Sequence, residues 1–163
     1  MTINEIQDEV IEEFSAFDDW MDKYQLLIDL GNEQEPLDEK YKTEQNLIDG
    51  CQSRVWLQCD CDNEGNLVFS AESDALIVKG IIALLIRVIS GHKPQEILDA
   101  DLYFIEEIGL KDHLSPTRSN GVIPLPYKAC RACSTKNIGT TLSSSLVSCA
   151  TACRSTFIRI ILF

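Results

Sequence analysis

Long apolar segments are missing from this sequence of 163 residues. No stretch approaches the roughly 20 uninterrupted apolar residues that a membrane-spanning helix needs, so we expect no membrane partner. The opening residues are rich in acids, which fits neither a secretory signal nor an arginine-rich transit peptide. We therefore expect a cytoplasmic chain, long enough for one domain with a real hydrophobic core.

Acidic residues are missing from the last third of the chain. Residues 1–112 hold all 26 Asp and Glu against 8 Lys and Arg, a net charge of −18, whereas residues 113–163 carry 6 Lys and Arg and no acid. The acidic part would repel nucleic-acid phosphates and would suit a protein with a basic face. Plain solubility explains the acidic excess equally well. We expect no nucleic-acid partner.

A disulfide framework is not expected, because the number of cysteines is odd and no signal peptide is apparent. Reduced thiols are the expectation, and at least one thiol is then free for chemistry. The seven cysteines are Cys51, Cys59, Cys61, Cys130, Cys133, Cys149 and Cys153.

Local patterns predict helices in the first part of the chain. Thr2 and Glu5 form a capping box ahead of apolar residues that recur at helical spacing as far as Phe17. A second amphipathic helix begins near Trp20 and is predicted to stop at Gly31, a natural residue to follow a helix. Residues 32–42 are polar, contain a proline, and are predicted to form a loop.

A hairpin and a buried helix are predicted next. Residues 53–59 alternate with a strand's period of two, residues 62–66 have turn composition, and residues 67–69 begin the return strand. Ser73 or Asp74 is then expected to cap a helix over residues 75–89 that is apolar almost all round and therefore buried. A short helix at Pro94 and another over residues 101–108 complete an α+β domain.

Cys51 lies on a predicted loop directly before a strand, in the segment Asp49-Gly50-Cys51-Gln52-Ser53. Gly50 permits a turn that other residues resist, so the cysteine can sit at a loop tip, within reach of a large partner. A small apolar residue filling a gap is the other interpretation, because free cysteine is among the most buried residue types. Local context leaves both open.

Four blocks of the sequence resemble the SufE family of sulfur-acceptor proteins. The segment from Gly50 to Trp56 resembles the family signature G-C-Q-S-x-V-W. Three further blocks agree in the same order, over residues 20–31, 73–80 and 109–121. The similarity covers roughly residues 5–121, and four motifs in register are far more specific than any one of them.

This resemblance implies an α+β fold like that of the scaffold protein IscU, with about three antiparallel strands, the third near residues 46–48. It implies that Cys51 takes persulfide sulfur from a SufS-type cysteine desulfurase and relays it to an iron–sulfur scaffold of the SufBCD type. The expected chemistry is that of a sulfurtransferase-like accessory protein. No cofactor or metal is implied, because pyridoxal phosphate belongs to the desulfurase. Whether the protein is an enzyme in the strict sense, or forms a homodimer, stays open.

Other residues are expected to assist Cys51. Arg118 could stabilise a thiolate or persulfide by its positive charge, or could pair with a surface carboxylate. His113 could shuttle a proton or satisfy a loop hydrogen bond. Asp74, together with Gly50 and Gln52, is a candidate for partner contact or loop gating.

The similarity ends after Gly121. We therefore divide the chain into a SufE-like domain, residues 1–121, and a divergent tail, residues 122–163. Pro124 and Pro126 exclude the helix that continues the family sequence. A shifted reading frame or genuine divergence would each explain the tail, which we expect to be poorly ordered.

Two other functions remain open. Cys130-x-x-Cys133 and Cys149-x-x-x-Cys153 come close to the spacing of a zinc ribbon, although chance in a cysteine-rich tail also explains them. Cys59 and Cys61 are too close in sequence for a standard zinc pair, but either could resolve an oxidised Cys51. The third function is purely allosteric activation of the desulfurase.

Overall fold

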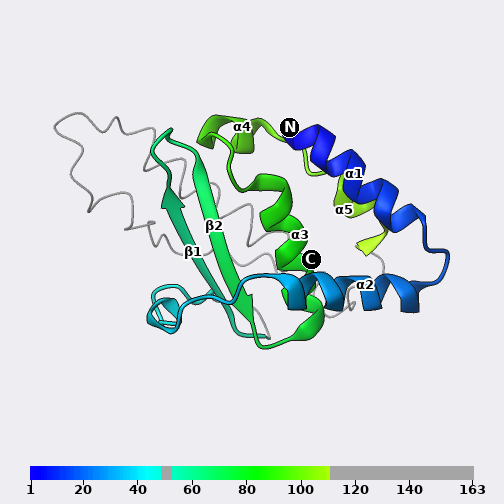
Figure 1. The fold of residues 1–163 in the computed structure, drawn as a ribbon, viewed down its shortest axis with the longest axis horizontal. Helices are drawn as coiled ribbons and strands as arrows, with labels where there is room; N and C mark the ends of the chain where they lie inside the picture. Colours follow the sequence, from blue (N-terminus) through cyan, green and yellow to red (C-terminus); the bar gives the residue numbers. More distant parts are fainter. Residues whose placement is uncertain (49–52, 111–163) are drawn as a thin grey trace, which may run out of the picture.

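The computed structural model describes residues 1–48 and 53–110 and shows an α+β fold, as predicted (Figure 1). An antiparallel hairpin stands at one side, and helices cover one of its faces. In chain order the elements are α1 (Ile3–Ser15), α2 (Trp20–Glu33), the 3₁₀ turn η1 (Glu39–Tyr41), β1 (Val55–Cys61), β2 (Leu67–Ser73), α3 (Leu76–Ile89), α4 (Pro94–Asp99) and α5 (Phe104–Glu107).

The sheet consists of β1 and β2, and the expected third strand is present only as an isolated bridge. The two strands pair in antiparallel register from Val55 with Ser73 to Cys61 with Leu67. Within the described residues, Leu47 forms a single bridge with Trp56 on the other edge of β1. The prediction of pairing near residues 46–48 is therefore correct in place, but the pairing is too short to make a strand.

The start of α1 follows from its capping box. The Thr2 N–H donates to Glu5 Oε2 at 2.7 Å, and the Glu5 N–H donates to Thr2 Oγ1 at 3.3 Å. These two bonds satisfy donors that the first turn of a helix leaves unpaired. The helix buries Val10 and Phe14 and ends at Ser15, two residues before the predicted limit at Phe17.

The second helix runs past the glycine at which it was predicted to end. Gly31 lies inside α2, which continues to Glu33. A Cβ on Gly31 would lie 2.9 Å from the backbone nitrogen of Gly80 in α3. Gly31 is therefore present for close packing of two helices, whereas the sequence alone suggested a helix terminator.

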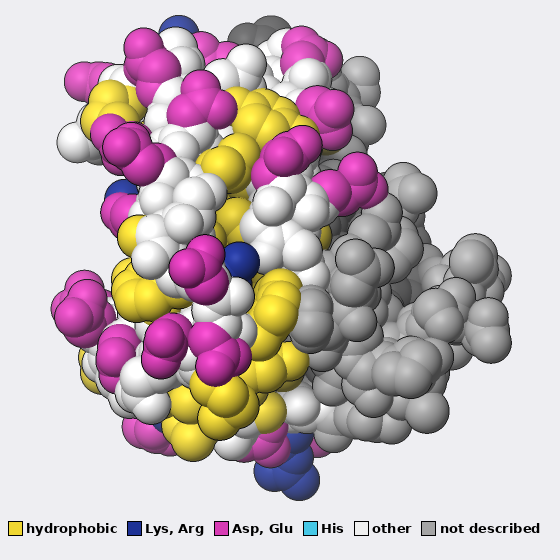
Figure 2. Space-filling view, turned by 90° about the vertical axis from the view of Figure 1, so that its right-hand side faces the viewer, with side chains coloured by type: hydrophobic (Ala, Val, Ile, Leu, Met, Phe, Trp, Pro, Cys, Tyr) yellow, Lys and Arg dark blue, Asp and Glu magenta, His cyan; other side chains and the backbone are white. Residues whose placement is uncertain are grey.

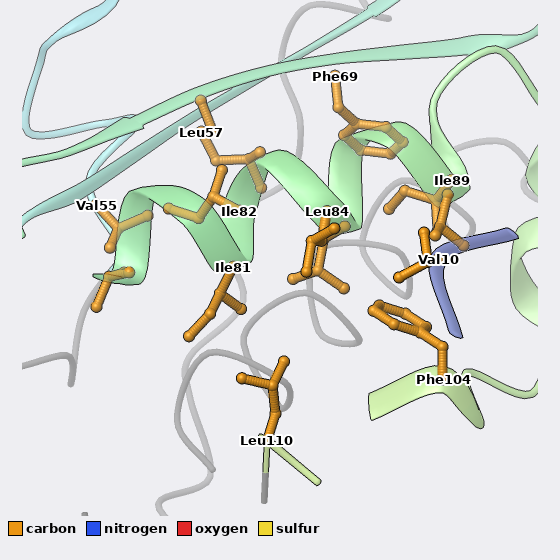
Figure 3. Packing of buried hydrophobic residues seen from close by; sticks show 14 of the residues in the cluster. Val10, Val55, Leu57, Phe69, Ile81, Ile82, Leu84, Ile89, Phe104 and Leu110 are labelled. Atoms are coloured by element: carbon orange, nitrogen blue, oxygen red, sulfur yellow. The ribbon is translucent and has the colours of Figure 1, made fainter. Parts of the chain in front are cut away.

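Helix α3 is the centre of the core, as its apolar composition predicted. Val55 and Leu57 of the hairpin lie on one side of it, and Phe104 and Leu110 lie on the other (Figure 3). The predicted caps are wrong, because the N-cap residue is Ala75, which makes no side-chain cap. The Ser73 hydroxyl instead accepts a hydrogen bond from the Ala75 N–H at 3.2 Å.

Polar contacts join α1 to the last described elements. The fully buried Gln7 side chain donates to the Asp101 carbonyl at 3.0 Å and accepts from the Phe104 N–H at 3.3 Å. Arg87 of α3 forms a two-pronged pair with Glu13, at 2.8 and 2.7 Å.

Within the described ranges, no helix is both long enough and apolar enough to cross a membrane.

Candidate functional site

Backbone hydrogen bonds join the residues on the two sides of the segment that carries Cys51. The Ile48 N–H donates to the Val55 carbonyl at 2.8 Å, and the Leu57 N–H donates to the Asn46 carbonyl at 2.9 Å. Ile48 and Val55 are both buried. The sheet therefore fixes the two points between which residues 49–54 run, at the end where β1 begins.

Asp74 ties the end of β2 to the residue that precedes β1. Its carboxylate oxygen Oδ1 accepts a hydrogen bond from the Arg54 N–H at 3.0 Å, and its own N–H donates to the Arg54 carbonyl at 3.3 Å. This pair of bonds extends the ladder one step beyond Val55 and Ser73. A carboxylate acceptor makes such a bond stronger than a neutral one. Asp74 is thus occupied in holding the strand next to the Cys51 segment.

A second polar cluster fixes the long connection before β1 onto the same end of the sheet. Glu72 of β2 accepts from the Leu37 N–H at 3.1 Å and pairs with Lys42 at 3.1 Å. Lys42 also pairs with Glu39 at 2.7 Å. Hydrogen bonds to Glu39 and then Glu72 raise the pKa of Lys42. Ion pairs of Lys42 with Glu39 and Glu72 therefore hold this connection against the sheet. The sequence alone predicted only a polar loop there.

The remaining predicted site residues lie outside the described residues. This holds for Cys51, for its neighbours Gly50 and Gln52, and for the two candidates nearer the C-terminus, Arg118 and His113. Of the predicted set, the structure places Asp74 alone, next to the backbone of Arg54. The four cysteines of the proposed zinc ribbon also lie outside the described ranges.

The two cysteines of β1 occupy different environments. Cys59 is buried in the core, whereas Cys61 is exposed. Cys61 is the last residue of β1, six residues beyond Val55, which corresponds to about 20 Å along a strand. The structure therefore places Cys61 far from the anchored ends of the Cys51 segment. No group of three or more metal-binding side chains occurs among residues 1–48 and 53–110.

The main-chain partner of Asp74 does not follow from local sequence patterns. The bond joins residues that are 20 positions apart, and no local pattern signals a contact at that distance. The hairpin register does contain the signal indirectly, because pairing Val55 with Ser73 makes Arg54 and Asp74 the next pair. A prediction of register, beyond one of strand positions, would have identified it.

The surface of the helical layer is acidic. Figure 2 shows carboxylate side chains spread over the side of the molecule where α1 and α2 meet, with few Lys and Arg side chains among them. The exposed face of α1 includes Glu5, Asp8, Glu9 and Glu12. The acidic excess of the first part of the sequence is thus displayed on the described surface.

The arrangement of the described elements is found in a protein of known structure. A hypothetical protein from Thermus thermophilus, whose structure was determined in solution, matches with a TM-score of 0.55. The match covers 68% of this chain and 80% of that chain at 19% sequence identity. At this identity the likeness concerns the fold alone, an α+β arrangement of a small sheet and helices.

The family follows from the sequence signature. The model of the SufE family, described as an Fe-S metabolism associated domain, matches residues 8–125. Because this range includes most of the chain, the protein belongs to the SufE family. The matched range includes Cys51, His113 and Arg118. The protein is accordingly associated with iron–sulfur metabolism.

Proposed function

We propose that the protein accepts sulfur as a persulfide on Cys51 from a SufS-type cysteine desulfurase and relays it to an iron–sulfur assembly scaffold. The observation that carries the proposal is the position of Cys51 in the family motif. The residues on either side of this segment are joined by the Ile48–Val55 bond, and Arg54 is also tied to Asp74 after β2. A segment held in this way on a rigid sheet suits chemistry with a protein-sized partner.

The transfer step is an exchange between a thiolate and a persulfide. The Cys51 thiolate attacks the terminal sulfur of the persulfide on the desulfurase cysteine. A sulfur–sulfur bond forms at Cys51, the original sulfur–sulfur bond breaks, and its electron pair leaves with the desulfurase thiolate. The reaction needs no external oxidant or reductant. Its rate depends on the thiolate fraction of Cys51 and on access to it.

Arg118 and His113 complete the proposal as supporting residues. A guanidinium near Cys51 would favour the thiolate and the persulfide anion over their neutral forms. The family match includes both residues. Arg118→Lys retains the positive charge and Arg118→Gln removes it, so the sulfur-transfer rates of the two variants measure the contribution of charge.

Mass spectrometry of the intact protein tests the proposal. After incubation with desulfurase and cysteine, wild type should gain about 32 Da, the mass of one sulfur atom, and a reducing thiol should remove it. Cys51→Ser should abolish this adduct, whereas Cys59→Ser and Cys61→Ser should keep it. The Cys61→Ser variant is the matched control for an exposed thiol, because Cys61 is solvent-exposed on the same domain.

One result would contradict the role of Cys51, and two others would support the other functions. If Cys51→Ser still accumulates protein-bound sulfane sulfur at the wild-type level, Cys51 is not the carrier. If the variant carries no sulfur but stimulates desulfurase turnover fully, the protein acts as an allosteric activator. Bound zinc without any sulfur adduct would favour the metal-binding function of the four tail cysteines.

A further inference from the structure

Asn46 lies where the connection that follows α2 reaches β1, five residues before Cys51. Its main chain is held on both sides. The Asn46 N–H donates to the Thr43 carbonyl at 3.1 Å, and the Asn46 carbonyl accepts from the Leu57 N–H at 2.9 Å. Asn46 is therefore the residue at which the connection leaves a turn and begins to pair with β1.

The half-buried Asn46 side chain joins this connection to the sheet a second time. Its Nδ2 donates to the Tyr41 carbonyl at 2.8 Å and to Gln58 Oε1 at 3.3 Å. Because a main-chain carbonyl can only accept, the orientation of this amide is fixed. Gln58 Nε2 donates to the Asp60 carboxylate at 3.4 Å, which leaves Gln58 Oε1 as the acceptor for Asn46. The amide thus joins Tyr41, the last residue of η1, to the face of β1 opposite its buried side chains.

The pairing that leads into the Cys51 segment is short. The Leu47–Trp56 bridge is isolated, outside the named strands, so few hydrogen bonds define its register. A slip by one residue would move the chain by about 3.3 Å and turn each side chain to the other face. The buried Ile48 resists a slip on the inner face. The Asn46 amide resists it on the outer face, because a slip would carry the amide away from both of its acceptors.

The register of this pairing matters for sulfur transfer, because two sulfur atoms on different proteins must meet. Reacting atoms need to approach within about 3–3.5 Å in an aligned geometry, and a misplacement of about 1 Å can cost about 100-fold in rate. A slip of one residue, about 3.3 Å, exceeds this tolerance. A residue that fixes the register therefore affects the rate of transfer, although it does not touch the reacting atoms.

We propose that Asn46 is a positioning residue for Cys51, and that its side chain fixes the register in which the chain enters the acceptor segment. This inference rests on the proposed function, because it takes Cys51 as the sulfur acceptor. Asn46 makes and breaks no covalent bond. Loss of its amide lowers the maximal rate of sulfur transfer and leaves the affinity for the desulfurase unchanged.

The test compares Asn46→Ala with Asn66→Ala in the full-length protein. Asn66 is a matched control, because its Nδ2 donates to Asp62 Oδ2 at 2.9 Å in the turn at the other end of the hairpin. In single-turnover transfer from persulfide-loaded desulfurase, Asn46→Ala should lower the maximal rate by about tenfold or more. Its half-saturating desulfurase concentration should stay within about twofold of wild type, because the positioning role leaves affinity unchanged. Asn66→Ala should leave both quantities within the same limit.

Two further measurements separate positioning from folding and from the reactivity of the thiol. The Leu57 amide, which donates to the Asn46 carbonyl, should exchange with solvent about tenfold faster in Asn46→Ala and unchanged in Asn66→Ala. Alkylation of Cys51 by iodoacetamide should stay within about twofold of wild type, because a small reagent needs the thiolate and access to it but no fixed orientation. Asn46→Asp replaces the donor at nearly constant volume, and should show the same loss of rate if Asn46→Ala is unstable.

Three results would overturn the inference and leave the proposed function intact, provided that Cys51→Ser no longer accepts sulfur. One is a wild-type maximal rate in both Asn46 variants. Another is a raised half-saturating concentration at an unchanged maximal rate, because Asn46 would then serve docking. The third is a parallel fall in alkylation, because Asn46 would then act on the thiol itself. If Cys51→Ser still accepts sulfur, the proposed function fails and the inference fails with it.

Discussion

Gly80 shows how one residue sets the distance between two helices. A Cβ built at this position would lie 2.1 Å from the Leu27 carbonyl oxygen and 3.0 Å from the Leu27 Cα, both on the backbone of α2. Backbone atoms cannot rotate away as a side chain can. The α2–α3 crossing therefore depends on the missing side chain at Gly80, and Gly31 faces it from the other helix.

We expect Gly80→Ala to lower the free energy of unfolding by about 3 kcal/mol, because α2 and α3 must separate to admit a methyl group. In a chain of this length the melting temperature should fall by about 10 °C. Urea unfolding followed by circular dichroism measures the loss. Gly65→Ala is the control: Gly65 has φ +84° but nothing within 4 Å of a Cβ, so only backbone strain of about 1–2 kcal/mol is expected. Equal costs for the two variants would contradict this account of the crossing.

A polar contact joins α1 to Tyr103, the residue before α5. The Tyr103 hydroxyl donates to Asp8 Oδ1 at 2.6 Å and lies 3.2 Å from the Asn4 carbonyl oxygen. The hydrogen bond to the Asp8 carboxylate, with a smaller effect of burial, raises the pKa of Tyr103 to about 12. The contact between α1 and the start of α5 therefore depends on the protonation of Tyr103.

We expect one tyrosine to ionise near pH 12 in a titration of phenolate absorbance, and Tyr103→Phe to remove this late component. The ordinary pKa of tyrosine is about 10, and the folded value lies above it. The contribution of Tyr103 to stability is therefore complete below about pH 10 and is lost as the pH rises through about 12. Tyr24→Phe serves as a control that should keep the late component. An unchanged titration in Tyr103→Phe would show that Asp8 and Tyr103 are not coupled in this way.

The acidic charge is a property of the whole molecule. The chain carries a formal net charge of −12 at pH 7, and its carboxylates are spread over the face where α1 and α2 meet (Figure 2). A field of this extent steers an approaching basic protein more than it strengthens a single contact.

Desulfurase binding should weaken steadily as salt rises from about 0.1 M to about 1 M, where the Debye length falls from about 10 Å to about 3 Å. We expect the dissociation constant to increase about tenfold, mainly through slower association. Stopped-flow or surface-based kinetics at several salt concentrations provides the rates, and circular dichroism confirms that the fold is retained. An affinity that stays flat across this range would mean that shape and apolar contact alone hold the complex.

Much of the fold was readable from local sequence patterns because the forces concerned act between near neighbours. The capping box of Thr2 and Glu5, the hairpin and the buried helix α3 each follow from periodicity or from hydrogen bonds within a few residues. The candidate site also follows from a local motif, because the residues around Cys51 resemble the family signature.

Tertiary structure decided what depends on contacts between distant segments. Gly31 looks like a helix end, yet it lies inside α2 and packs against Gly80 of α3. The lack of a side chain at Gly31 lets the two helix backbones approach closely. Asp74 looks like a helix cap, yet it binds the backbone of Arg54 across the sheet. The 58% exposure of Leu76 could not be read from an apolar run in which most residues are buried. The sequence determined which elements form, and packing determined where they end and which side chains remain at the surface.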